Sequence, residues 1–180
     1  MSAIQHPSPA SRPKKYDALT RALHWIFAAI ILYTMVAGIS LHFITNRALF
    51  NFLSTLNMSL ASCLILLFPV RYLWSFFRKE PQKIKTIPRV QHAMAHVVHS
   101  MIYALTAFVL VSGFVMVPDG YSLFGLVHIP TPYGEGPITD HWFDLHKFGC
   151  YALLLLVVLH IAAALKHHFA LRNGVLNKML

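Results

Sequence analysis

The chain has 180 residues, of which 57% are hydrophobic and only 12% are charged, whereas charged residues make up about a quarter of a typical soluble domain. This composition excludes an ordinary soluble globular protein and indicates one membrane domain. Fifteen Lys and Arg against six Asp and Glu give a net charge of +9. A basic excess is also typical of nucleic-acid-binding proteins, so the positions of the charges must distinguish the two interpretations.

Four stretches of the sequence are long and apolar enough to cross a bilayer as α-helices. A crossing helix needs about 20 apolar residues, because no water in the hydrocarbon core can satisfy an open backbone. The stretches run roughly over residues 23–44, 53–77, 94–117 and 142–165. They predict an all-α fold, an integral membrane four-helix bundle. In the second stretch we expect a kink at Pro69 that neighbouring helices repair, and an Arg71 side chain that extends to the interface.

The Lys and Arg residues concentrate on alternate connections between these stretches. Four precede the first stretch, six lie around the second-to-third connection and three follow the fourth, whereas Arg47 and Lys147 are alone on the other two connections. Cytoplasmic loops carry the excess of Lys and Arg in membrane proteins. We therefore predict that both termini are cytoplasmic, and that the charge reflects topology and not a nucleic-acid partner. The domains expected are a polar tail at 1–17, a transmembrane domain at 18–170 and a second cytoplasmic tail at 171–180.

The long third-to-fourth connection, residues 118–140, is rich in Pro, Gly, Tyr and Phe. It is too long for a tight turn, and loops of this length in compact domains are usually functional. We expect it to be a lid or a docking surface on the outer face, where a periplasmic redox partner would bind.

Twelve histidines are the most informative feature of a chain this apolar, since an ionisable group inside a membrane is costly and suggests function. His146 and His160 are fourteen residues apart on the fourth stretch. At about 100° and about 1.5 Å per residue they share one face to within about 40° and lie about 21 Å apart. This arrangement is typical of a helix that supplies one axial ligand to each of two stacked haems. Hydrogen bonds between helices are the alternative.

His24 opens the first stretch, and His160 lies six residues before Lys166 near the end of the fourth. The two imidazoles should therefore lie at the same depth, where they can share one iron. Such bis-imidazole ligation leaves a six-coordinate haem that suits electron transfer. The alternative for His24 is an interfacial residue beside Trp25.

At these positions the chain resembles the prokaryotic cytochrome b561 family. The segments that carry the resemblance are Lys15-Tyr16, Ala22-Leu23-His24-Trp25, Ala95-His96-Val97-Val98-His99, Leu145-His146, Leu159-His160 and Ala162 to His168. The resemblance implies a four-helix fold in the bacterial inner membrane, haem b in its core, and electron transfer to or from quinone. One branch of the family resembles superoxide oxidases that reduce ubiquinone. The sequence has no CxxCH motif, which excludes a covalently attached haem c.

One position departs from the family pattern. The resemblance implies a histidine on the second helix as partner to His146, and Asn57 stands there. Substitute ligands are Met58, one residue round the helix, and His42, which lies about 27 Å above His24 on the same face. Three outcomes remain open: an outer haem held by His146 alone, a substitute ligand, or a single inner haem. We favour the single inner haem, which removes the electron path to the outer surface.

Other histidines have weaker predictions. His92, His96 and His99 form a stripe at i, i+4 and i+7; a zinc site is the alternative, but the family match implies that His96 and His99 line the inner haem. His167 and His168 are either hydrogen-bonding partners of a quinone or interfacial anchors. The remaining histidines are expected to be solvated: His6, His128 and His141.

Three functions follow from these observations. The first is a redox protein that exchanges electrons with quinone and oxidises superoxide in one branch of the family. The second is an electron conduit without substrate chemistry that serves a partner on the outer face. The third is a non-haem transporter of protons or metal ions that uses the same histidines.

Overall fold

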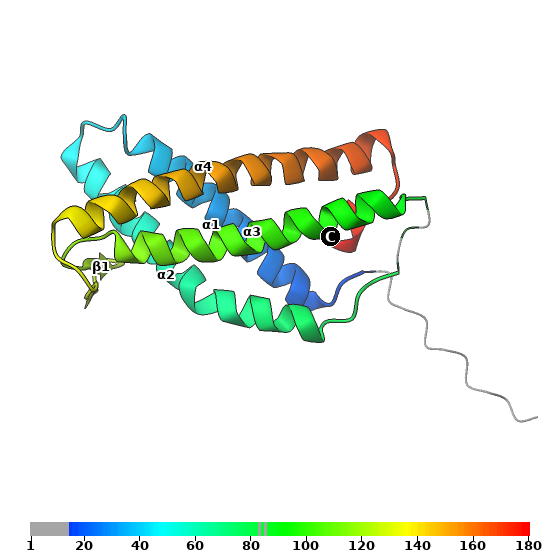
Figure 1. The fold of residues 1–180 in the computed structure, drawn as a ribbon, viewed down its shortest axis with the longest axis horizontal. Helices are drawn as coiled ribbons and strands as arrows, with labels where there is room; N and C mark the ends of the chain where they lie inside the picture. Colours follow the sequence, from blue (N-terminus) through cyan, green and yellow to red (C-terminus); the bar gives the residue numbers. More distant parts are fainter. Residues whose placement is uncertain (1–14, 83, 85) are drawn as a thin grey trace, which may run out of the picture.

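Four long helices make up most of the computed structural model, which describes residues 15–82, 84 and 86–180 (Figure 1). They are α1 (Ala18–Ser40), α2 (Arg47–Phe77), α3 (Arg89–Val115) and α4 (Pro137–Leu165), and α4 continues into a π-helical turn, Lys166–Ala170. Each helix is long and apolar enough to cross a membrane. The predicted all-α membrane bundle is confirmed. His6 and the other residues of the predicted tail up to residue 14 lie outside the described residues.

The helices begin several residues before the apolar stretches that predicted them. Asp17 caps α1, since its carboxylate accepts hydrogen bonds from the backbone N–H and the hydroxyl of Thr20 at 2.9 and 2.6 Å. Asn46 caps α2 in the same way at Leu49, and Pro137 occupies the first turn of α4. Hydropathy marks the hydrocarbon core, whereas caps decide where a helix starts. The helices therefore extend beyond their apolar stretches.

The second helix remains α-helical through Pro69. Two residues later, the Arg71 side chain, which we expect to extend to the interface, lies against the rings of two neighbouring helices. Its guanidinium lies between helices, 5.1 Å from the ring centre of Phe27 on α1 and 5.5 Å from that of Tyr103 on α3. The cation is thus part of the bundle interior.

The helices pack mainly as two pairs. α3 lies along α4, α1 lies along α2, and α2 also contacts α3. A small apolar core joins three helices through Phe27, Leu64 and Leu110. Among the described residues, the backbones of α1 and α4 hardly approach each other. The side chains between these two helices therefore have room that close backbone packing would remove.

The two ends of the bundle differ in what covers them. At the terminal end, defined by Tyr16 and Lys178, the backbone N–H of Tyr16 donates to the carbonyl of Lys178 at 3.1 Å. A short 3-10 helix, Leu176–Lys178, follows the turn after α4, and the indole N–H of Trp25 donates to the carbonyl of Met179 at 2.9 Å. The predicted tail at 171–180 thus packs back against the start of α1.

The opposite end, called the hairpin end, carries a β-hairpin that the sequence did not predict. Strands β1 (Tyr121–Leu123) and β2 (Val127–Ile129) pair antiparallel, with Ser122 opposite His128. Two hydrogen bonds fix the hairpin to α2: the N–H of Phe124 donates to the Ser59 hydroxyl at 2.7 Å, and the hydroxyls of Tyr121 and Ser62 pair. The segment expected as a lid is therefore anchored to α2.

Candidate functional site

Three histidines from three helices converge at the terminal end. The ring centroids of His24 on α1 and His160 on α4 are 6.4 Å apart, with the planes at 65°. His99 on α3 lies on the other side, with its ring centroid 5.2 Å from that of His160. The structure thus brings His24 and His160 together and adds His99 to the same cluster.

The position of His24 follows from the way α1 is fixed against α2. The indole N–H of Trp74 on α2 donates to the Thr20 hydroxyl at 3.1 Å and to the Asp17 carboxylate at 3.3 Å. Burial acts to raise the pKa of the Asp17 carboxyl, but the hydrogen bonds from Thr20 and Trp74 outweigh it and hold that pKa below its ordinary value. Thr20 and His24 are one turn apart and share a face. The cap therefore sets the rotation that directs His24 toward the bundle.

Arg71 is a member of the site that sequence reasoning missed. One guanidinium nitrogen, Nη2, lies 3.5 Å from Nδ1 of His24, while the rings of Phe27 and Tyr103 pack against the same guanidinium. An arginine within an apolar helix is in itself a signal of function. From the sequence, Arg71 is instead interpreted as a side chain that extends to the interface, because the sequence alone does not show which neighbours this side chain contacts.

The imidazole nitrogens of this cluster have few partners within the protein. In the described part of the chain, no hydrogen bond engages a ring nitrogen of His99 or His160, and His24 has only the long contact to Arg71. His24 and His160 are partly buried, and His99 is exposed. Neutral imidazole offers one nitrogen lone pair, which can bind a metal ion.

At the hairpin end, His146 has the opposite environment. Its Nδ1 lies 3.1 Å from the carbonyl oxygen of Val109 and 3.2 Å from the Ser112 hydroxyl, and its Nε2 lies 3.3 Å from the Cys150 sulfur. Donation from Nδ1–H to the carbonyl and acceptance by Nε2 from the thiol satisfy both nitrogens. Gly113 is required here, because a Cβ on it would lie 2.9 Å from Cε1 of the imidazole. Contacts within the protein thus hold His146.

The candidate partners of His146 lie on α2 and on the turn after α1. The side-chain oxygen of Asn57 on α2 is buried, and among the described residues it has no hydrogen-bond partner. His42 is exposed on the turn after α1, with Nδ1 3.1 Å from the Gly38 carbonyl oxygen. Met58 lies on α2 beside Asn57. No second iron ligand for His146 is apparent among these side chains.

The other histidines lie apart from the cluster or have local partners. Nδ1 of His167 is 2.7 Å from the Asn173 side-chain nitrogen, and the His168 ring contacts Phe169 with centroids 4.7 Å apart. In the described residues, no group of three or more His, Cys, Asp or Glu is arranged to hold a metal ion. His128 on β2 and His141 near the start of α4 are exposed, as expected.

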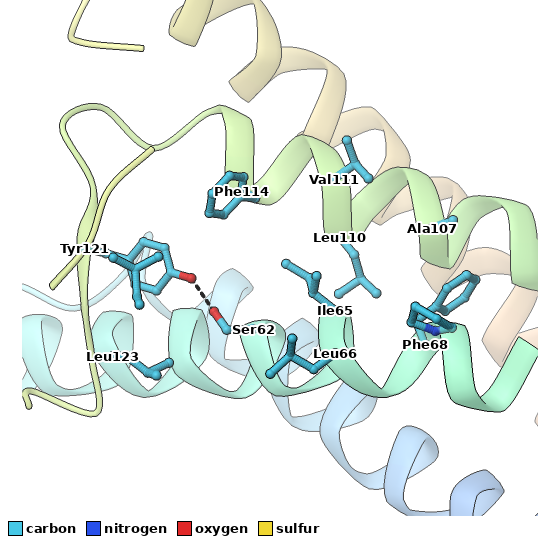
Figure 2. A pocket seen from close by; sticks show the side chains of 12 residues that line it. Ser62, Ile65, Leu66, Phe68, Ala107, Leu110, Val111, Phe114, Tyr121 and Leu123 are labelled. Carbon is cyan, nitrogen blue, oxygen red and sulfur yellow. Dashed lines mark hydrogen bonds between the residues drawn. The ribbon is translucent and has the colours of Figure 1, made fainter. Parts of the chain in front are cut away.

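An apolar groove of about 500 Å³ runs between α2, α3 and the hairpin (Figure 2). The paired hydroxyls of Ser62 and Tyr121 lie at its hairpin end. Phe68 lies toward the other end, and its ring centroid is 6.4 Å from that of Phe27 and 6.2 Å from that of Tyr103. Phe68 in the groove lining therefore contacts the same two rings, Phe27 and Tyr103, that pack against the Arg71 guanidinium.

The family model for prokaryotic cytochrome b561 matches residues 15–180 of the chain. The chain belongs to the prokaryotic cytochrome b561 family. Cytochrome b561 homolog 2 of Escherichia coli (strain K12) is 27% identical over 175 residues, covering 93% of this chain and 92% of the relative. A probable superoxide oxidase, CybB, of Yersinia pestis is 22% identical over 170 residues, covering 93% of this chain and 96% of the relative.

Membership of the cytochrome b561 family implies haem b as the cofactor, and the terminal-end cluster fits it. Two metal–nitrogen bonds of about 2 Å, with about 1 Å from each nitrogen to its ring centre, place coaxial imidazole centroids roughly 6 Å apart. The His24–His160 separation of 6.4 Å agrees with this value, whereas the His99–His160 separation of 5.2 Å is shorter. The wide spacing of the α1 and α4 backbones also suits a cofactor between them.

Proposed function

We propose that this cytochrome exchanges electrons with a quinone through one haem b whose axial ligands are His24 and His160. The observation that carries the proposal is the facing pair of imidazoles, 6.4 Å apart, on helices whose backbones hardly approach. Haem supplies one-electron chemistry at this position, and ligation by both imidazoles leaves no open iron site for oxygen. His99 and Arg71 then act on the haem environment and not as ligands.

The contrast between the two ends supports our proposal of a single haem. His146 has both ring nitrogens engaged by Val109, Ser112 and Cys150, and Asn57 stands where the family pattern implies its partner. Amide side chains are poor iron ligands. We propose that the hairpin end holds no haem.

We place the terminal end at the cytoplasmic face of the bacterial inner membrane. Support comes from the Lys and Arg residues, which concentrate on the termini and the α2–α3 connection. On this assignment residues 18–170 form the transmembrane domain, preceded and followed by cytoplasmic segments. Protease access to residues 171–180 in inside-out vesicles, and protection in right-side-out vesicles, would test the orientation.

Quinone, and ubiquinone in particular, is the proposed exchange partner because it reaches the protein from the lipid. The groove between α2 and α3 is apolar, and Phe68 in its lining contacts the ring of Tyr103. Superoxide is the second candidate substrate, since one relative is named a probable superoxide oxidase. A single haem at the terminal end disfavours an electron conduit to an outer partner, because it provides no path across the bundle.

The ligand assignment is tested by the haem content of three variants. His24→Ala and His160→Ala should each abolish the b-type spectrum of the dithionite-reduced protein. His99→Ala is the matched control from the same cluster and should retain it. Retention of the full spectrum in His160→Ala, or its loss only in His99→Ala, would overturn the assignment.

The quinone proposal is tested on the wild-type protein. Anaerobic mixing of the reduced cytochrome with a soluble ubiquinone analogue should reoxidise the haem, and the reduced protein should persist without the analogue. A reduced haem that the analogue leaves unchanged would contradict quinone as the partner. Faster haem reduction by a superoxide source than by the same source with superoxide dismutase would support the second candidate.

A further inference from the structure

Arg71 is a cation within the helix span with no carboxylate beside it. Among the described residues the only ion pair joins Lys147 to Asp144, at the far end of the bundle. The guanidinium is partly buried and is held by two aromatic faces, those of Phe27 and Tyr103. Aromatic rings stabilise a cation but do not neutralise it. A charged side chain inside a membrane helix bundle usually pairs with another charged or polar group.

A second arginine lies close to the first. Arg78, two turns further along α2, packs over the Tyr16 ring at 4.8 Å, and its buried Nε has no hydrogen-bond partner among the described residues. A small cavity of about 10 Å³ is lined by both arginines, which is roughly the space of one water-sized group. The other residues that line it are Thr20, Leu23, Trp74, Ser75 and Tyr103. Two cations with spare donors therefore face one small polar space.

The contact between Arg71 and His24 cannot survive metal ligation unchanged. When Nε2 of an imidazole binds iron, Nδ1 keeps its hydrogen and becomes a donor. Arginine has only donors, so its Nη2 at 3.5 Å from Nδ1 would face another N–H group. Arg71 then requires a different acceptor within reach, and carboxylates are the acceptors that its planar fork matches best.

We propose that Arg71 and Arg78 bind a propionate carboxylate of the haem held by His24 and His160, and that the charge of Arg71 raises the midpoint potential of that haem. The inference rests on the proposed axial ligands. Reduction removes one positive charge from the iron, so a nearby cation in a low-dielectric interior favours the reduced state. Loss of Arg71 removes that cation and also leaves the propionate charge unpaired, and both effects lower the potential.

Redox titration of purified full-length variants tests this inference. Arg71→Gln should shift the midpoint potential to a more negative value, and Arg71→Lys, which keeps the charge, should shift it less. Arg47→Gln is the control, because Arg47 is an exposed arginine at the other end of the same helix. An Arg71→Gln protein that keeps its haem at the wild-type potential would overturn the inference.

A second experiment covers the case in which Arg71→Gln loses its haem. The wild-type apoprotein is reconstituted with haem b or with its dimethyl ester, in which both propionates are uncharged. The ester should bind several-fold more weakly than haem b to wild type, and this difference should shrink in Arg71→Lys. Equal binding of both haems by wild type would overturn the inference. Failure of the axial-ligand proposal appears separately, as haem retained in His160→Ala.

Discussion

The two ends of this bundle contain the same residue type in opposite environments. At the terminal end, His24, His99 and His160 converge, and among the described residues their nitrogens have only one long contact, to Arg71. At the hairpin end, His146 packs against Gly113 with both of its nitrogens engaged. At the hairpin end the protein itself provides the partners of the imidazole, whereas at the terminal end we propose that a haem provides them.

The hairpin end also contains Asn57, at the position where the family resemblance implies a histidine. With Asn57 in the second helix, the oxygen of that amide is buried and lacks a partner in the described part of the chain. His146 keeps the carbonyl contact that often orients a metal-binding imidazole, because Nδ1 faces Val109. Asn57 and His146 are therefore the two residues whose substitution tests the proposed absence of a haem at the hairpin end.

The largest expected effect is the gain of a haem at the hairpin end. Asn57→His supplies the imidazole that the family pattern implies, so that two helices offer one ligand each. The haem-to-chain ratio should rise from about one toward two on reconstitution with excess haem. Asn57→Ala is the control and should leave the ratio unchanged. An unchanged ratio in Asn57→His would show that the lack of a histidine at position 57 is not by itself what prevents haem binding at the hairpin end.

A smaller effect is expected from crowding His146. In Gly113→Ala the new Cβ would lie 2.9 Å from the imidazole, and overpacking of this kind costs about 1–3 kcal/mol. Thermal unfolding in detergent should show the loss. Gly38→Ala is the matched control, because nothing lies within 4 Å of a Cβ there, and it should be neutral or stabilising by about 0.5–1 kcal/mol. Equal stability of the two variants would argue against close packing of the His146 imidazole on Gly113.

The smallest effect is expected at the cap that positions His24. Asp17→Ala removes the acceptor for Thr20 and Trp74 and should cost about 1 kcal/mol at neutral pH, whereas Asp17→Asn should cost less because Asn is also a good N-cap. Thermal unfolding of the three proteins checks this order.

The pH dependence of that cap has a definite sign. The folded state lowers the pKa of Asp17, so the carboxylate contributes stability that is present above the unfolded value of about 3.9 and lost as pH falls through the lower folded value. The difference between wild type and Asp17→Ala should therefore shrink in acid. A difference that stays constant from pH 7 to pH 3 would contradict the charged cap.

The sequence predicted the helices and the main histidine pair because both depend on local patterns. Apolar stretches mark the spans, and similar distances from the ends of their spans place His24 and His160 at one depth. The contact of Arg71 with His24 was not predictable in this way. It depends on how α1 and α2 rotate against each other, which the Asp17, Thr20 and Trp74 contacts decide.

The β-hairpin and the contacts of His146 could not be predicted from the sequence for a similar reason. Strands of three residues carry too little alternation to distinguish them from a loop, and this hairpin is held by Ser59 and Ser62 on a helix distant in sequence. The engagement of His146 likewise depends on α3 lying along α4. Such long-range contacts leave no periodic signal in a single sequence.

The central claim is that one haem binds at the terminal end and none at the hairpin end. The most direct test is the haem-to-chain ratio of the wild-type protein measured beside that of His146→Ala. The account predicts a ratio of about one in both proteins, because His24 and His160 remain intact. A ratio of about two in wild type that falls in His146→Ala would contradict it.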